Sequence, residues 1–92
     1  MARVKVPGKK KADIMLFALS TCVWCGKTKK LLDDMGVEYT YEYVDLLSGK
    51  DREEAVKQIS HWNSSMSFPT MVINNEKSIV GFKEEEIRQA LR

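Results

Sequence analysis

The spacing of apolar residues changes from one stretch of the chain to the next, and each spacing predicts a different element. Residues 14–19 are apolar without interruption, which is typical of a strand that is covered on both faces of a sheet. Further along, apolar residues recur at helical spacing, at Trp24, Leu31, Leu32 and Met35. Gly36 follows, and glycine tolerates the left-handed conformation that commonly ends a helix. The pattern therefore predicts a central strand and a first helix that ends at Gly36.

Residues 37–46 alternate in character and predict a second strand. One face carries Tyr39, Tyr41 and Tyr43, and the other carries Glu38, Thr40 and Glu42. The polar face argues for a strand at the edge of the sheet, with solvent on at least one side. Tyrosines in a row can stack nucleic-acid bases, but at this spacing they are more typical of half-buried sheet surface.

A capping pattern begins the second helix. Ser48 is followed three residues later by Asp51, so a helix is expected from there through about residue 60. Its apolar face consists of Ala55, Val56 and Ile59. A polar loop that contains His61 and Trp62 is expected to follow.

The remaining residues predict a hairpin and a last helix. Residues 68–73 read as a third strand and residues 78–80 as a fourth, antiparallel to the third. Asn74 and Asn75 between them tolerate the positive φ of a tight turn. Residues 83–91 form the last helix. The predicted order is β-α-β-α-β-β-α, which places the chain in the α/β class.

Charge separates the start of the chain from the rest. The formal net charge is only +2, yet residues 1–12 contain five basic residues and no acid. We therefore expect a basic, irregular N-terminal arm over residues 1–12 and one domain over residues 13–92. A basic arm can contact nucleic acid, but the interleaved aromatic residues of a single-strand binder are missing. A solvated arm without a nucleic-acid partner is expected.

No stretch is apolar enough for export or for a membrane. The run at residues 14–19 is shorter than the roughly 7–15 apolar residues of a signal peptide. It is far shorter than the roughly 20 residues of a membrane span. We expect a cytoplasmic monomer without a membrane partner. In that compartment a C-x-x-C pair is more often catalytic than structural.

Cys22 and Cys25 are the only cysteines, and they lie where the first strand passes into the first helix. The thiolate is the reactive form of cysteine, and a helix N-terminus favours negative charge through its free N–H groups and its dipole. Cys22 falls at the first turn, and Cys25 lies about one turn further in, within reach of a disulfide that Cys22 forms with a substrate. The spacing predicts that Cys22 attacks and Cys25 resolves. Trp24, between them, is placed to shape the surface that meets the substrate.

Three other uses of the cysteine pair remain open from the residues alone. A zinc site usually needs four ligands, and only His61 remains as a nitrogen ligand, although carboxylates could complete the set. A static disulfide would close a very short loop and stabilise little. Two unreactive buried thiols are the third possibility. His61 could also shuttle protons or tune Cys22, but a solvent-exposed loop histidine is the simpler interpretation. We expect no metal and no cofactor.

The element order, with Cys22 and Cys25 after the first strand and Phe68-Pro69 before the third, resembles the glutaredoxin branch of the thioredoxin fold over about residues 13–92. The resemblance implies a four-stranded mixed sheet of order 2-1-3-4, with helices one and three on one face and helix two on the other. It also implies that the Phe68–Pro69 bond is cis, lies beside Cys22, and lets Phe68 offer its backbone to a substrate. Without the resemblance, Pro69 is equally well a break between loop and strand, because only about 5–6% of X–Pro bonds are cis.

Two positions depart from the glutaredoxin pattern. Glutaredoxins usually carry a lysine three residues before the first cysteine, which helps to hold a glutathione carboxylate, and this chain has Leu19. Near the last helix they tend to carry two glycines followed by aspartate, whereas this chain reads Gly81-Phe82-Lys83. That reading is more similar to the glutaredoxin-like electron donors of ribonucleotide reductase, which a protein reductase reduces. Those donors, however, also usually have the lysine that this chain replaces with Leu19.

The residues and the resemblance together predict a dithiol thiol–disulfide oxidoreductase that acts on protein or low-molecular-weight disulfides. The expected substrate surface consists of Trp24, Phe68, Pro69, Gly81 and Phe82. We expect a reductase of the thioredoxin-reductase type to restore the dithiol, and glutathione is the alternative. A metal-binding or iron–sulfur carrier that bridges two copies through Cys22 is the alternative from another class, although carriers of this family usually keep only the first cysteine. A thiol-based sensor without turnover is a further alternative.

Overall fold

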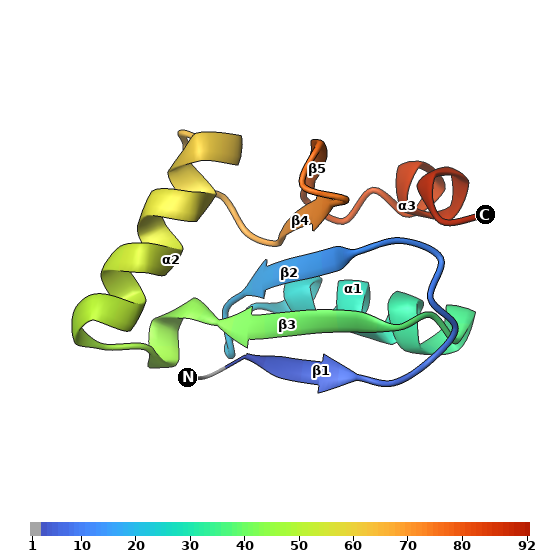
Figure 1. The fold of residues 1–92 in the computed structure, drawn as a ribbon, viewed down its shortest axis with the longest axis horizontal. Coiled ribbons are helices and arrows are strands. Elements are labelled where there is room, and N and C mark those ends of the chain that lie inside the picture. The colour runs from blue at the N-terminus through green and yellow to red at the C-terminus, as the bar shows by residue number, and fades with distance from the viewer. Residues whose placement is uncertain (1–2) are drawn as a thin grey trace.

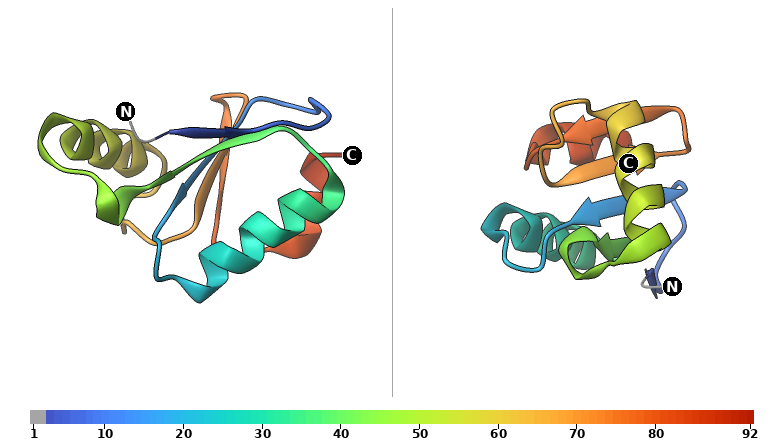
Figure 2. Two further views of the ribbon diagram at one scale, coloured as in Figure 1. Left: turned by 90° about the horizontal axis from the view of Figure 1, so that it is seen from below. Right: turned by 90° about the vertical axis from the view of Figure 1, so that its left-hand side faces the viewer.

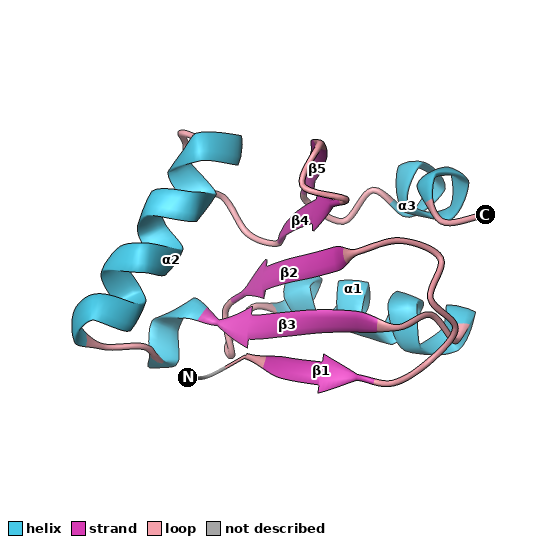
Figure 3. Ribbon diagram, viewed as in Figure 1, coloured by secondary structure: helices cyan, strands magenta, loops and turns pink. Residues whose placement is uncertain are grey.

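The structure is a computed structural model that describes residues 3–92, and it shows a five-stranded mixed sheet with helices on both faces (Figures 1 and 3). The strands are β1 (Val4–Val6), β2 (Ile14–Ala18), β3 (Tyr39–Tyr43), β4 (Thr70–Ile73) and β5 (Lys77–Val80). The helices are α1 (Val23–Met35), the short 3-10 helix η1 (Val44–Leu46), α2 (Gly49–Trp62) and α3 (Glu84–Ala90). The strand order is β1-β3-β2-β4-β5. Strands β2 and β3 are parallel, and the other neighbours are antiparallel.

Strand β2 is apolar throughout because it faces two hydrophobic cores. Ile14, Leu16 and Ala18 point to a core that they share with residues of α1 and α3, whereas Phe17 points to a core shared with α2. Figure 2 shows α1 and α3 on one side of the sheet and α2 apart from them. The expected division of the helices, two on one face and one on the other, is therefore confirmed.

The number of strands is a correction to the sequence-based prediction, because the sheet has five strands and not four. The additional strand, β1, lies in the segment that we expected to be an irregular arm. Residues 1 and 2 of that arm lie outside the described residues. The other four strands follow the predicted order, since β3-β2-β4-β5 corresponds to 2-1-3-4.

The basic segment pairs with β3 through its backbone, and two ion pairs accompany that pairing. Strand β1 pairs antiparallel with β3, where Arg3 lies 3.6 Å from Glu42 and Lys5 lies 3.7 Å from Glu38. Strand β3 is therefore an internal strand, and the predicted edge position is wrong. The polar face of β3 contacts cations of the same chain, and Glu42 on that face is only 6% exposed.

The tyrosine face of β3 is sheet surface against the first core, as the spacing predicts. Tyr39 is buried, Tyr41 and Tyr43 are half-buried against the same core, and the rings of Tyr41 and Tyr43 meet edge to face at 5.2 Å. Burial raises the pKa of Tyr39 well above its ordinary value, and so does the hydrogen bond that its hydroxyl donates to the Asp33 carboxylate at 2.7 Å. The tyrosines therefore stabilise the sheet.

The end of α1 agrees with the sequence-based prediction, and the end of α2 differs from it. Gly36 ends α1 in the left-handed conformation with φ 69°, as predicted. Helix α2 continues to Trp62, so His61 and Trp62 form its last turn and do not belong to a loop. Trp62 packs against the core beneath α2, and His61 contacts its ring edge-on at 4.9 Å. Tertiary packing of Trp62 thus extends the helix beyond its local pattern.

The predicted hairpin is present, with β4 and β5 antiparallel. Asn74 and Asn75 form its turn with φ values of 54° and 53°. Across residues 3–92, none of the helices combines the length and the apolar character needed to cross a membrane.

Candidate active site

Cys22 is the N-cap residue of α1, directly after the short loop that follows β2. Its backbone is extended, with φ −90° and ψ 119°, and the Cys25 N–H donates a hydrogen bond to its Sγ at 3.2 Å. The Cys22 N–H donates to the Leu19 carbonyl at 3.2 Å, which closes the turn into the helix. The sulfur therefore occupies the place of a capping oxygen, where the free N–H groups of a helix meet negative charge.

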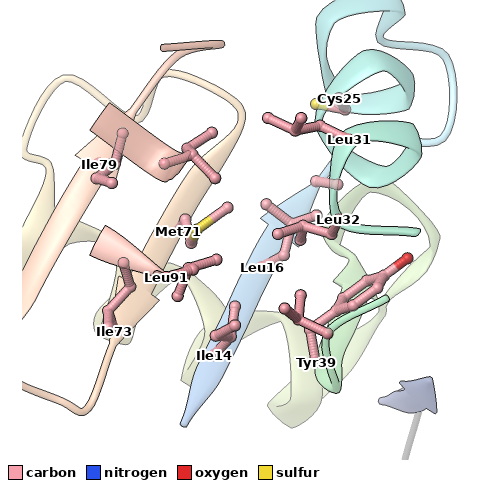
Figure 4. Close-up of a cluster of buried hydrophobic side chains, with 13 residues drawn as sticks. Ile14, Leu16, Cys25, Leu31, Leu32, Tyr39, Met71, Ile73, Ile79 and Leu91 are labelled. Atoms are coloured by element: carbon pink, nitrogen blue, oxygen red, sulfur yellow. The ribbon is translucent and has the colours of Figure 1, made fainter. Parts of the chain in front are cut away.

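Cys25 lies one turn further along α1 and is buried. It is 1% exposed, and its side chain belongs to the core that Leu31, Leu16 and Met71 help to form. Figure 4 shows its sulfur beside Leu31 at one end of this core, with Tyr39 towards the other end. The reactive pair is thus built into the end of the main hydrophobic core.

The two sulfurs differ in solvent access and in electrostatics. Cys22 is half-buried and Cys25 is buried, and both are free thiols. Burial raises the pKa of the Cys25 thiol to about 12, and its hydrogen bond with Cys22 adds to the rise. The Leu19 N–H, which donates to Cys25 Sγ at 3.5 Å, acts in the opposite direction. Cys25 is therefore held protonated, whereas Cys22 meets the solvent.

An aromatic pair stands beside the cysteines. Trp24 is 55% exposed, and its ring stacks on Phe82 with 5.9 Å between centroids and 26° between planes. The Lys27 ammonium lies 4.8 Å from the centre of the Trp24 ring, within the range of a cation–π contact. Two residues from distant parts of the sequence therefore form one apolar platform with a cation at its rim.

The loop before β4 and the turn before α3 are joined next to this platform. The Gly81 N–H donates to the Pro69 carbonyl at 2.8 Å, and the Phe68–Pro69 bond is cis, as the family resemblance implies. Phe68 and Phe82 pack against the same core as Cys22. Gly81 has φ 87°, a conformation that glycine adopts without strain. All the site residues expected from the sequence therefore gather at one end of the sheet.

Three neighbours of the cysteines were missed by sequence reasoning. Asp45 accepts hydrogen bonds from the backbone N–H of Ser20, at 2.8 Å, and from its hydroxyl. The bonds from Ser20 lower the pKa of the Asp45 carboxyl. Leu46, next in the chain, is 66% exposed. The sequence did contain a signal that Asp45 and Ser20 lie close together. Asp45 follows β3 and Ser20 follows β2, and the carboxyl ends of parallel strands meet at one edge of a sheet.

His61 is not part of this arrangement. No hydrogen bond or ion pair of the described residues joins it to either cysteine. Within residues 3–92, no group of three or more His, Cys, Asp or Glu side chains is placed to hold a metal ion together.

Comparison with known proteins gives consistent matches. The glutaredoxin family model matches residues 14–78. The crystal structure of the glutaredoxin from Methanosarcina mazei Go1 is 54% identical, with a TM-score of 0.92 over 99% of this chain and 88% of that chain. The methanoredoxin of Methanosarcina acetivorans is 55% identical, with a TM-score of 0.88 over 91% of this chain and 88% of that chain. The glutaredoxin of Archaeoglobus fulgidus is 28% identical, with a TM-score of 0.81 over 88% and 87% of the two chains. The comparison with curated proteins gave no match.

Proposed function

This chain belongs to the glutaredoxin family of thiol–disulfide oxidoreductases and carries its redox pair at Cys22 and Cys25, and on this basis we propose a dithiol mechanism with unequal roles for the two sulfurs. Cys22 attacks the substrate and Cys25 resolves the product of that attack. The observation that supports this assignment is the contrast between Cys22, which is half-buried at the helix N-terminus, and Cys25, a residue that is only 1% exposed. A substrate disulfide can reach the first sulfur and is kept from the second.

The reaction transfers two electrons in two exchanges. The Cys22 thiolate attacks one sulfur of the substrate disulfide, forms a mixed disulfide, and releases the other substrate sulfur as a thiolate. Cys25 then loses its proton and attacks Cys22 Sγ. The second substrate sulfur leaves with the electron pair, and the two released thiolates take up protons from Cys25 and from solvent. The substrate is reduced to two thiols, and the protein is oxidised to the Cys22–Cys25 disulfide.

Substitution of Cys25 tests this assignment. Cys25→Ser lacks the resolving thiol, so it should accumulate a stable mixed disulfide with a disulfide-containing protein, seen on non-reducing gels and by mass spectrometry. Cys22→Ser should form none and serves as the matched control. In the unsubstituted protein, Cys22 should react with iodoacetamide before Cys25 near neutral pH. Faster alkylation of Cys25 would refute the proposed roles.

The surface around Cys22 supports protein disulfides as the substrates. Trp24, Phe82 and Phe68 lie at the same end of the sheet as the reactive sulfur, and exposed aromatic side chains commonly anchor protein interfaces. The Pro69 ring is fully buried beneath this surface, and its carbonyl accepts the Gly81 N–H, so the two residues fix the backbone that supports it. We assign these five residues to substrate binding, with the Phe68 backbone as the part that an extended substrate segment pairs with.

The charges near the cysteines support a protein reductase as the electron source. Glutathione carries two carboxylates and an amine, so tight binding calls for charged partners at both of its ends. Leu19 packs against the core beneath α2 and offers no cation, and Lys83 stands where an aspartate is usual in the family. Lys83 already lies 3.8 Å from Glu86, and exposed ion pairs typically contribute about 0–1 kcal/mol. A protein partner would depend on the aromatic surface and not on these few charges.

Reduction rates decide between the two electron sources. The oxidised protein is mixed with glutathione in one series and with thioredoxin-reductase-type proteins of the same cell in another, and the second-order rates are compared. A faster rate with a reductase at cellular concentrations supports the proposal. Rapid reduction by glutathione, with no reduction by any reductase, returns the protein to the glutathione-dependent members of its family.

A further inference from the structure

The carboxylate of Asp45 links the segment that follows β3 to the loop that follows β2. Asp45 belongs to η1, directly after β3, and its two oxygens accept the backbone N–H and the hydroxyl of Ser20 in the loop after β2. The two residues are 25 positions apart in the sequence. Hydrogen bonds to a carboxylate are stronger than bonds between neutral groups, so Ser20 is held by two charge-assisted bonds.

The clamped serine adjoins the residue that contacts both cysteines. Leu19 donates its N–H to Cys25 Sγ at 3.5 Å and accepts the Cys22 N–H at its carbonyl at 3.2 Å. Peptide planarity couples the position of Ser20 to that of the Leu19 carbonyl, which belongs to the peptide unit between the two residues. A displacement of Ser20 therefore moves the Leu19 carbonyl, and through the turn that this carbonyl closes with the Cys22 N–H it alters how Leu19 is held against Cys25.

We propose that Asp45 is a positioning residue for the resolving step: its carboxylate clamps Ser20 and so holds the Leu19 N–H on Cys25 Sγ, where that N–H stabilises the thiolate that attacks the mixed disulfide. Asp45 touches neither substrate nor sulfur, and it acts through the loop. The assignment rests on the proposed dithiol function and extends it to a residue outside the C-x-x-C pair.

The charge of Asp45 has a second, opposing effect on the same sulfur. Cys22 and Asp45 are the titratable groups whose charges act on Cys25, and both raise its pKa. The rest of the core that contains Cys25 is mainly apolar, and Tyr39 lies towards its other end. The carboxylate thus adds a small contribution to the burial that keeps Cys25 protonated before the mixed disulfide forms, while the clamp that it provides aids the thiolate afterwards. The two effects are separable, because an amide keeps the hydrogen bonds and removes the charge.

Two-phase kinetics on the whole protein test the role of Asp45. The reduced protein reacts with a symmetric aryl disulfide whose thiolate product absorbs visible light. The first thiolate is released at a rate that depends on disulfide concentration, as Cys22 attacks, and the second at a rate that does not, as Cys25 resolves. The variants are Asp45→Ala, which loses both bonds, Ser20→Ala, which loses one, and Asp45→Asn, which keeps bonding groups. Asp34, an exposed acid of α1 paired with Lys30, provides matched controls as Asp34→Ala and Asp34→Asn.

The expected pattern is specific to the second phase. In Asp45→Ala the second release should slow roughly fivefold at neutral pH, as expected for the loss of about 1 kcal/mol of hydrogen bonding, with the first release within about twofold of the parent. Ser20→Ala should show a smaller loss of rate. Asp45→Asn should match or exceed the parental rate at neutral pH, and the pH profile of its second release should shift to lower pH, because the negative charge near Cys25 is gone. The Asp34 variants should behave as the parent does.

Each other result contradicts a defined part of the proposal. If the unsubstituted protein releases only one thiolate, the dithiol function is refuted, and the role of Asp45 is refuted with it. A parent that releases two, with Asp45→Ala unchanged in the second rate and its pH profile, contradicts the role of Asp45 alone. Equal slowing of both releases indicates general damage to the loop and also refutes a specific role. If Asp45→Ala fails to fold, an unshifted pH profile in Asp45→Asn refutes the charge effect, and a parental second rate in Ser20→Ala refutes the clamp.

Discussion

Two regions of the molecule differ in their side chains: one has charges that are paired within the chain, and the other has exposed apolar side chains around a thiol. One is the β1–β3 edge, formed by residues in or next to these two strands, where Arg3 lies 3.6 Å from Glu42 and Lys5 lies 3.7 Å from Glu38. The other is the reactive end, formed by Cys22, Val23, Trp24, Leu46 and Phe82. There, Val23 is 70% exposed, Leu46 is 66% exposed and Trp24 is 55% exposed.

The contrast separates structural from functional surface. At the β1–β3 edge the charges find partners within the chain, so the region completes the sheet. At the reactive end, large apolar side chains remain exposed around a thiol, and an exposed apolar patch is a common mark of an interaction site. Substitutions at the first region should therefore change stability, and substitutions at the second should change activity. Four measurements, from the largest expected effect to the smallest, test that separation.

Loss of the Cys22 sulfur should have the largest effect on activity. Both Cys22→Ser and Cys22→Ala should reduce turnover to the background of uncatalysed exchange, because the attacking thiolate is gone. Their stabilities should differ, since serine is a favoured N-cap and alanine caps poorly, by about 0.5–2 kcal/mol in favour of serine. Turnover assays and urea unfolding of the reduced proteins measure the two effects. Equal stabilities would show that the cap at position 22 contributes little.

Alkaline pH should weaken the fold at both ends of the main core, because Cys25 and Tyr39 are buried acids. The pKa of Cys25 is raised to about 12 from 9.0. Burial therefore contributes stability that is fully present below pH 9 and is lost as the pH rises through about 12. Removal of the thiol in Cys25→Ala should make the pH dependence shallower by up to about 1.4 kcal/mol per pH unit. Urea unfolding of the reduced proteins at successive pH values above 8 measures this slope.

Tyr39 provides the matched comparison at the other end of the core. Its pKa is raised by burial and by Asp33, so it too loses stabilisation as the pH rises. Tyr39→Phe should flatten the alkaline profile without changing turnover, whereas Cys25→Ala should change both. A Cys25→Ala profile parallel to that of the parent would contradict the assigned burial effect.

The aromatic platform should affect catalysis with proteins more than with small molecules. Trp24→Ala and Phe82→Ala should each lower kcat/KM for a protein disulfide about tenfold, the equivalent of about 1.4 kcal/mol, because each removes half of the stacked pair. The rate with a small aryl disulfide should change little. Val56→Ala, which trims an exposed apolar side chain on α2, is the control. Equal losses with both substrates would indicate that the platform supports Cys22 and does not bind protein.

The ion pairs of the β1–β3 edge should give the smallest effects. Lys5→Ala should lower the free energy of unfolding by about 0–1 kcal/mol, since its ammonium is exposed. Arg3→Ala should have the larger effect of the two, because it leaves the buried Glu42 without its cation. Both losses should shrink at high salt, and turnover should stay at the parental rate. Lys11→Ala serves as the control for loss of a basic residue. A drop in turnover without loss of stability would link this edge to function.

Local signals in the sequence were sufficient for the elements that position the cysteines. The end of α1 at Gly36 and the hairpin turn at Asn74 and Asn75 follow from backbone sterics at single residues, so they can be read in place. The strand before Cys22 is recognisable because burial on both faces requires an unbroken apolar run. These features do not depend on which distant segment comes to lie beside them.

Contacts between distant segments could not be predicted, because they depend on which segments the fold brings together. The cations at residues 3 and 5 and the anions at residues 38 and 42 were visible in the sequence, but solvent can satisfy either set. Only the pairing of β1 with β3 brings the two sets together. Trp24 was expected at the surface that meets the substrate, and it is 55% exposed, but the sequence did not show that its ring stacks on Phe82 from the other end of the chain.

The identity and spacing of the two reactive sulfurs were determined by the sequence, whereas their inequality was decided by the tertiary structure. The strand-to-helix junction places Cys22 at an N-terminus through local geometry alone. Burial of Cys25, its raised pKa and the clamp of Asp45 on Ser20 all require β3 and the core to close around the loop. Desolvation and hydrogen-bond geometry depend on the whole surroundings of a group, and those surroundings exist only after the strands have paired.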